Sequence, residues 1–177
     1  YQAFSQREVN ISLLDARAGS PPTAVELLRR HSSNSNLNEL SQFLKDWELW
    51  CAELLESHLS YPVLAYYRSQ HSNQSWLGAL TMILDASTLA IVGIDGAPAH
   101  QARLTFAMAR HTVVDLSQIF NRPPKSPVID CLSKNDLMRM HEVLTEAGVN
   151  LSIGDEASQR LTELRKSYEP YVNALSE

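Results

Sequence analysis

Residues 76–94 form an apolar run of 19 residues that contains a single charged side chain, Asp85 near its centre. As a helix this run would be roughly 28 Å long, close to the thickness of a bilayer's hydrocarbon core. A carboxylate at the middle of a membrane span costs about 2.5 to 3.5 kcal/mol, however, and Thr81, Ser87 and Thr88 add further polar atoms. We therefore favour a nearly fully apolar helix at the centre of a bundle and keep a partly membrane-associated helix as the alternative. In either case we expect Asp85 to have a partner, because an unpaired buried carboxylate is costly.

Apolar residues recur at helical spacing in most of the remaining chain, and no convincing strand alternation is present. The stripes occupy residues 37–58, 97–120, 137–147 and 157–175, and each repeats in steps of three and four. Helix-start patterns of the capping-box type, with a cap residue followed three positions later by an acid, begin at Ser5, Thr23, Asn36, Ser133 and Ser152. Pro62 and Pro170 should each interrupt a helix, because proline lacks an amide donor. The sequence predicts an all-α bundle of about six to eight helices.

Turn-forming tracts divide the chain into blocks. The strongest break is the proline-rich connection at residues 122–132. It separates a main helical domain, residues 1–121, from a C-terminal helical pair, residues 133–177, which packs on the main domain or on a neighbouring copy. Linker-like stretches at 19–22 and 32–35 lie inside the main domain.

Charge and cysteine usage exclude several classes of protein. With 15 basic and 20 acidic residues the net charge is −5, which disfavours nucleic acid as a partner. Cys51 and Cys131 are far apart and form no Cys-x-x-Cys pair, so neither a disulfide framework nor a zinc knuckle is predicted, and a reducing compartment fits best. The chain begins at Tyr1 without a secretory signal pattern, and we read it as a piece of a longer protein.

Polar side chains suggest one ligand site or buried polar cluster, formed by Arg68, His71, Gln74, Asp85, His111 and Asp115. One helix should end and the apolar helix begin near Arg68, His71 and Gln74. These side chains either bind an anion or form hydrogen bonds that cap and stabilise the turn. His111 and Asp115 are four residues apart on a face shared with Leu104 and Met108, and they form either a buried pair, half a metal site, or a local hydrogen-bonded pair.

Patterns typical of enzymes are missing from the sequence. It contains no Glu-x-x-His pair, no His-Glu-x-x-His, no Gly-x-Ser-x-Gly elbow and no glycine-rich phosphate loop. We therefore predict neither catalytic residues nor a metal or cofactor, and keep a metal-dependent helical enzyme only as the least favoured alternative.

Four short sequence segments show a family resemblance: HLSYPVLAYYRSQH (58–71), NQSWLGALT (73–81), ILDAS (83–87) and LTFAMARH (104–111). They resemble the long cytoplasmic C-terminal region of a bacterial potassium-channel-like family, in which a two-helix pore unit precedes a helical domain. The resemblance covers about residues 5 to 120 and is strongest between 47 and 115. It brings no catalytic or ligand residues with it. The filter run Thr-Val-Gly-Tyr-Gly of a potassium pore is not in this chain, so the resemblance implies a pore before Tyr1.

The resemblance implies a regulatory or assembly domain of a membrane ion channel, on the cytoplasmic face of the bacterial inner membrane. Such a domain would act as a homo-oligomer through packing or gating rather than through chemistry, with an unidentified small-molecule effector as a further partner. A small-molecule sensor with a pocket beside Arg68, His71, Asp85 and His111 is the alternative.

Overall fold

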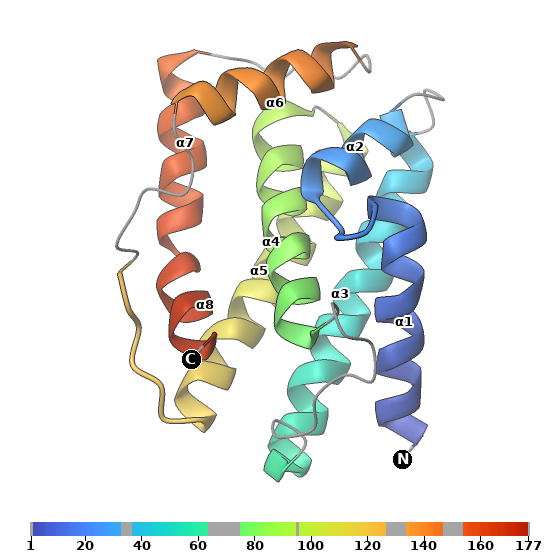
Figure 1. Cartoon of the computed structure of the whole chain (residues 1–177), viewed down its shortest axis with the longest axis vertical. Helices are drawn as coiled ribbons and strands as arrows, with labels where there is room; N and C mark the ends of the chain where they lie inside the picture. Colours follow the sequence, from blue (N-terminus) through green and yellow to red (C-terminus); the bar gives the residue numbers. More distant parts are fainter. Residues whose placement is uncertain are drawn as a thin grey trace.

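A computed structural model describes residues 2–32, 37–63, 75–94, 96–126, 134–146 and 154–176. Within these ranges the chain forms eight α-helices and no strand, which confirms the predicted all-α bundle. The helices are α1 (Gln2–Ala18), α2 (Ala24–Ser32), α3 (Leu37–Ser60), α4 (Trp76–Gly93), α5 (Ala97–Ile119), α6 (Lys134–Glu146), α7 (Asp155–Lys166) and α8 (Glu169–Leu175). In Figure 1 the long helices α3, α4 and α5 run roughly vertically, α1 lies on one side of them and α7 and α8 on the other.

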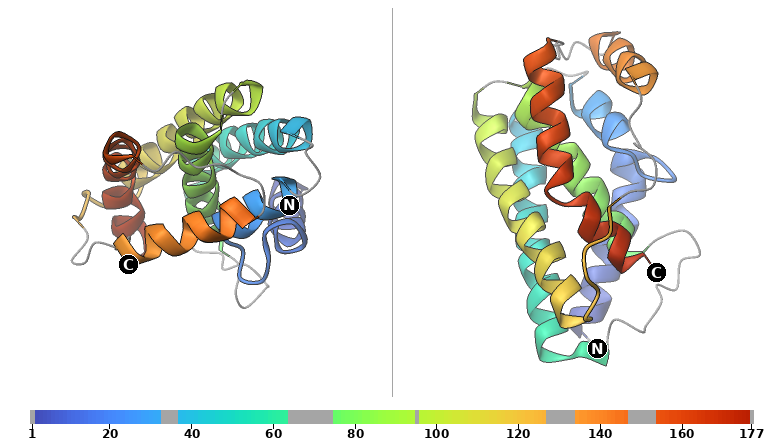
Figure 2. Two further views of the ribbon diagram at one scale, coloured as in Figure 1. Left: turned by 90° about the horizontal axis from the view of Figure 1, so that it is seen from above. Right: turned by 90° about the vertical axis from the view of Figure 1, so that its left-hand side faces the viewer.

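The apolar helix α4 lies at the centre of the bundle, as its composition predicts. It contacts α1, α2, α3, α5, α7 and α8, and the view from above in Figure 2 shows it among its neighbours. Eleven of its 18 residues are buried. It is also the one helix in the described ranges long and apolar enough to cross a membrane, but in this structure protein neighbours cover most of it.

Helices α3 and α5 pack side by side and are joined by two buried threonines. The hydroxyl of Thr105 donates to the carbonyl oxygen of Leu44 at 2.8 Å, and that of Thr112 donates to the carbonyl oxygen of Cys51 at 3.1 Å. Both bonds join residues 61 positions apart in the chain. The two helices therefore run in the same direction with a fixed register, which the apolar stripes alone do not specify.

The helix boundaries test the predicted start and stop signals. Helix α3 ends at Ser60 before Pro62, and Pro170 lies in the first turn of α8, so both predicted interruptions are confirmed. The C-terminal block accordingly contains three helices rather than a pair. Thr23 does cap α2, since its hydroxyl accepts the amide of Glu26 at 3.3 Å.

Two of the predicted helix starts are wrong, and two fall outside the described ranges. Ser5 lies inside α1, which begins three residues earlier, because a four-residue capping pattern does not prevent a helix from extending upstream. Helix α7 begins at Asp155 with Gly154 as its N-cap, so the start predicted at Ser152 is misplaced. Asn36 and Ser133 lie outside the residues that the structure describes.

The C-terminal helices pack against the main block of the same chain. Helix α7 contacts α4, and α8 contacts both α4 and α5. Two bonds fix the connection: the amide of Lys125 donates to the carbonyl oxygen of Pro170 at 2.9 Å, and Nε of Arg110 donates to that of Ser167 at 3.1 Å. This packing places the turn between α7 and α8 against the centre of α4.

Candidate functional site

A cavity of about 650 Å³ lies beside one face of α4. Helix α4 contributes Leu77, Gly78, Thr81, Met82, Asp85, Thr88 and Leu89, which recur at helical spacing and so share one side of the helix. The opposite walls come from the start of α2, from Met140 of α6, and from the α7–α8 region. Its lining is mostly apolar with a few polar groups, as is typical of small-molecule sites.

Among the described residues, Asp85 is the one carboxylate on the cavity wall, and its partner is Tyr168. The Tyr168 hydroxyl donates a short hydrogen bond to Oδ1 of Asp85. Tyr168 comes from the turn between α7 and α8, is fully buried, and packs edge-to-face on Phe106 with ring centroids 6.0 Å apart. The expectation that Asp85 has a partner is therefore confirmed.

The pKa of the Asp85 carboxyl group is raised overall, because burial is the largest of several opposing effects. Burial raises the pKa of this carboxyl group, whereas the Tyr168 hydrogen bond and the positive charge of Arg165 lower it. Burial, followed by the proximity of Asp85, raises the pKa of the Tyr168 hydroxyl, so the tyrosine is the proton donor in the pair. Arg165 also lines the cavity, but its guanidinium is engaged with Glu169, to which Nε donates at 2.6 Å.

Three other hydroxyl groups on the wall donate their protons within the protein. Thr81 donates to the carbonyl oxygen of Leu77 at 2.8 Å, and Thr88 donates to that of Leu84 at 2.7 Å. Ser176 donates to the carbonyl oxygen of Asn173 at 2.8 Å. These hydroxyls have only acceptor lone pairs left for a molecule in the cavity.

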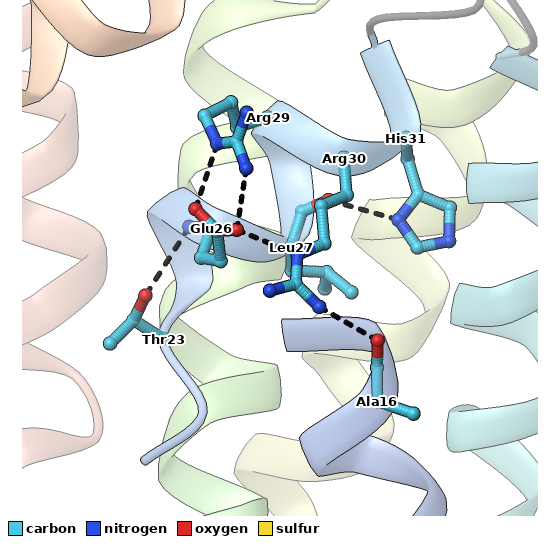
Figure 3. A network of polar contacts seen from close by, with 7 residues as sticks. All are labelled: Ala16, Thr23, Glu26, Leu27, Arg29, Arg30 and His31. Atoms are coloured by element: carbon cyan, nitrogen blue, oxygen red, sulfur yellow. Dashed lines mark hydrogen bonds and ion pairs between the residues drawn. The ribbon is translucent and has the colours of Figure 1, made fainter. Parts of the chain in front are cut away.

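The two helix N-termini that reach the cavity are each capped by a side-chain hydroxyl. Ser75 caps α4 by accepting the amide of Gly78 at 2.9 Å. At the start of α2, Glu26 accepts hydrogen bonds from Arg29 and Arg30, which lower the pKa of its carboxyl group to about 2. Figure 3 shows this network, in which Arg30 also donates to the carbonyl oxygen of Ala16 near the end of α1. The ionised Glu26 lies in the first turn of α2, where it offsets the positive end of the helix dipole.

The remaining predicted site residues do not join Asp85. Nε2 of His111 lies 3.3 Å from a carboxylate oxygen of Asp115, but their side chains are 59% and 34% exposed, so this pair is not the buried pair that we considered. Leu104 on the same face is also exposed, because this face of α5 lies outside its packed stripe. Arg68, His71 and Gln74 lie outside the described residues. Across the described ranges no group of three or more His, Cys, Asp or Glu side chains is placed to hold a metal ion.

Sequence reasoning missed Tyr168, Arg165 and Glu169 as neighbours of Asp85. The signal available was the stripe through residues 157–175, which predicts that Tyr168 faces the core. A buried tyrosine requires a hydrogen-bond partner for its hydroxyl, and Asp85 requires a donor. The requirement of Tyr168 for an acceptor and of Asp85 for a donor would therefore have predicted this pair.

His58 is a second buried polar group, distant from the cavity wall. Its side chain is fully buried, Nδ1 donates to the carbonyl oxygen of Leu54 at 2.8 Å, and Nε2 has no hydrogen-bond partner. The ring packs against Trp76 and Phe120, with centroids 5.3 and 5.9 Å away. Burial lowers the pKa of His58 below 6.5, the Leu54 hydrogen bond opposes this effect, and the charge of Arg7 adds to it.

We expect the free energy of unfolding to fall as the pH drops through 6.5, in part because of His58. The unfolded chain then binds a proton that the folded state resists, so protonation favours unfolding. Urea unfolding of wild type and His58→Phe between pH 7 and 5 should show a shallower decline in the variant. His100→Gln, which removes an exposed histidine from the first turn of α5, is the matched control and should keep the wild-type slope. Equal slopes for His58→Phe and wild type would contradict this role.

The fold and the cavity define the class of protein: an all-α bundle with a mostly apolar cavity, lined by a few polar groups, between its central helix and its C-terminal helices. Comparison with protein-family models, with curated proteins and with solved structures finds no match to this chain.

Proposed function

We propose that this chain is the soluble cytoplasmic regulatory or assembly domain of a bacterial potassium channel, on the cytoplasmic face of the inner membrane. The channel assignment rests on the four sequence segments that resemble the channel family. The observation that supports it is that the segment of strongest resemblance, residues 47–115, includes α4 and most of α3 and α5, which form the centre of the bundle. A domain of this kind acts on an attached pore through changes in packing, without chemistry of its own.

Assembly needs a surface, and α1 offers one. Val9 and Leu13 are 48% and 59% exposed and lie one helical turn apart. Leu13 also lines a second cavity, of about 430 Å³, which lies between α1 and α3 and includes the aromatic rings of Phe43, Trp47 and Trp50. Exposed apolar groups beside a cavity lined by both aromatic and charged side chains, Arg17, Glu39 and Asp46 among the latter, are typical of an interface, so a second copy of the chain is the occupant that we propose.

The domain should therefore self-associate, and the double variant Val9→Ser/Leu13→Ser should do so about tenfold more weakly, a loss of about 1.4 kcal/mol. Sedimentation equilibrium over a range of concentrations measures both. The double variant Met138→Ser/Val143→Ser, which removes two exposed apolar side chains from α6, is the control and should associate like wild type. A monomer mass that does not change with concentration would overturn the assembly role.

The channel assignment has its own test, namely the intact mass and membrane partitioning of the native gene product. A larger, membrane-bound product with two apolar spans around a filter-like Gly-Tyr-Gly before Tyr1 supports it. A soluble product that begins near Tyr1 overturns it.

The second candidate function is small-molecule sensing, and the cavity beside Asp85 is the observation that favours it. The two functions are compatible, since a regulatory domain requires an effector with different affinity for its two arrangements. A ligand held between α4 and the C-terminal helices would bias how these elements pack.

A further inference from the structure

We propose that the cavity beside α4 binds a small amphipathic organic cation, an ammonium group on an apolar body, with the ammonium group on Asp85. This inference deepens the sensing function and rests on it; it does not require that the chain belong to a channel.

The first argument is that the groups nearest Asp85 offer acceptors rather than donors. The Tyr168 hydroxyl donates its hydrogen bond to Oδ1 of Asp85, and the hydroxyls of Thr81 and Thr88 donate theirs to backbone carbonyl oxygens. Among the described residues the recorded hydrogen bond to Asp85 is on Oδ1, and the residue is only partly buried. A ligand group that binds beside Asp85 must therefore supply the donors, as a protonated amine does.

The second argument is charge. Asp85 contributes a negative charge to the wall when ionised, and the positive charge of Arg165 is offset by Glu169. At the starts of α2 and α4, the hydroxyls of Thr23 and Ser75 each accept one backbone amide, which leaves fewer amides for an anion. The balance favours a cation over an anion.

The third argument is the apolar remainder of the cavity. Met82 and Leu89 of α4 face Met140 of α6 and Leu161 of α7, and methionine side chains adapt readily to different ligand shapes. These walls accept a short alkyl or aryl group. An inorganic cation would leave them uncovered and would find a single carboxylate ligand.

The test compares three probes of one length: hexylammonium, hexanol and hexanoate. Calorimetry on the full chain should give a dissociation constant of about 1 mM for hexylammonium and at least about tenfold weaker binding for the other two. Two-dimensional NMR should place the shifted amides at residues on the cavity wall. The probes differ in charge at matched length, so the comparison isolates the head group.

Two variants assign the binding to the proposed contacts. Asp85→Asn keeps an acceptor for Tyr168 but removes the charge, and should weaken hexylammonium binding about tenfold. Thr81→Leu fills part of the cavity and should weaken all probes. Asp115→Asn, at an exposed carboxylate on α5, is the matched control and should bind like wild type. Circular dichroism of each variant verifies that the bundle is folded.

Each other outcome has a definite meaning. If hexanol binds as tightly as hexylammonium, or hexanoate binds more tightly, the ligand class is wrong, while sensing at this cavity stands. If no probe binds up to about 10 mM, both the ligand class and the sensing function are overturned. Hexylammonium binding that survives Asp85→Asn unchanged also overturns the proposed contact.

Discussion

Replacing Tyr168 with alanine should lower the free energy of unfolding by about 3 to 5 kcal/mol, the usual cost of truncating a fully buried aromatic side chain. Tyr168 is 0% exposed, packs on Phe106 of α5 and donates to Asp85 of α4. Its removal leaves a cavity at the point where the α7–α8 turn meets the main block. It also leaves Asp85 without its donor, so two separate costs act at one position.

Two further variants separate these costs. Tyr168→Phe keeps the ring and loses only the hydroxyl, so it should cost about 1 to 3 kcal/mol, the range for leaving a buried polar group without its partner. Tyr171→Ala removes a tyrosine that is only partly buried in α8, and should cost about 1 kcal/mol. Chemical denaturation followed by circular dichroism gives all three values. Equal, small losses for Tyr168→Ala and Tyr171→Ala would mean that Tyr168 does not anchor the C-terminal helices in solution.

The anchor also shows how far sequence reasoning reaches in this protein. Periodicity locates helices well when their apolar stripes are long, and α3, α4 and α5 appear within a few residues of the predicted ranges. Periodicity also predicts which side of α7 faces inward, and so the burial of Tyr168. It cannot predict that Tyr168 meets Asp85, because the two residues are 83 positions apart and the pairing depends on how whole helices cross.

Polar contacts between helices were the least predictable features of the fold. Thr105 and Thr112 fall beside the apolar stripe of α5, and their hydroxyls fix its register against α3. A threonine at such a position has the same local pattern whether it faces solvent or a carbonyl group of another helix. Only the packed structure distinguishes the two cases.

The site prediction failed for a related reason. Asp85 and His111 both stand out in the sequence, yet Asp85 lines the cavity and His111 is 59% exposed on another face of the bundle. Spacing of three or four residues shows that His111 and Asp115 share a face, and it does not show whether that face is covered. The exposed Leu104 two turns earlier illustrates how an apolar neighbour can mislead this inference.

The centre of the bundle gives the second large effect: Leu80→Ala should lower the free energy of unfolding by about 2 to 5 kcal/mol. Leu80 is 0% exposed, and it lies on the part of α4 turned away from the cavity, so truncation leaves a void that neighbouring helices cannot easily fill. Leu49→Ala, in the middle of α3, is the matched control. Leu49 is 61% exposed, and its truncation should change the free energy of unfolding by about 0.5 kcal/mol or less.

The contrast between these two leucines also decides between the two interpretations of the apolar run in aqueous solution. A central bundle helix derives its stability from side chains that its neighbours bury, so truncating Leu80 must lower the free energy of unfolding far more than truncating Leu49. Urea titrations of the two variants without detergent measure the difference. If Leu80→Ala costs no more than Leu49→Ala, α4 is not packed by its neighbours in water, and the alternative of a membrane-associated α4 gains support. A large difference means instead that the apolar side chains of α4, which would suit a bilayer, stabilise the bundle by packing against its neighbours. Asp85 can lie in this apolar helix because Tyr168 of the C-terminal block donates a hydrogen bond to it.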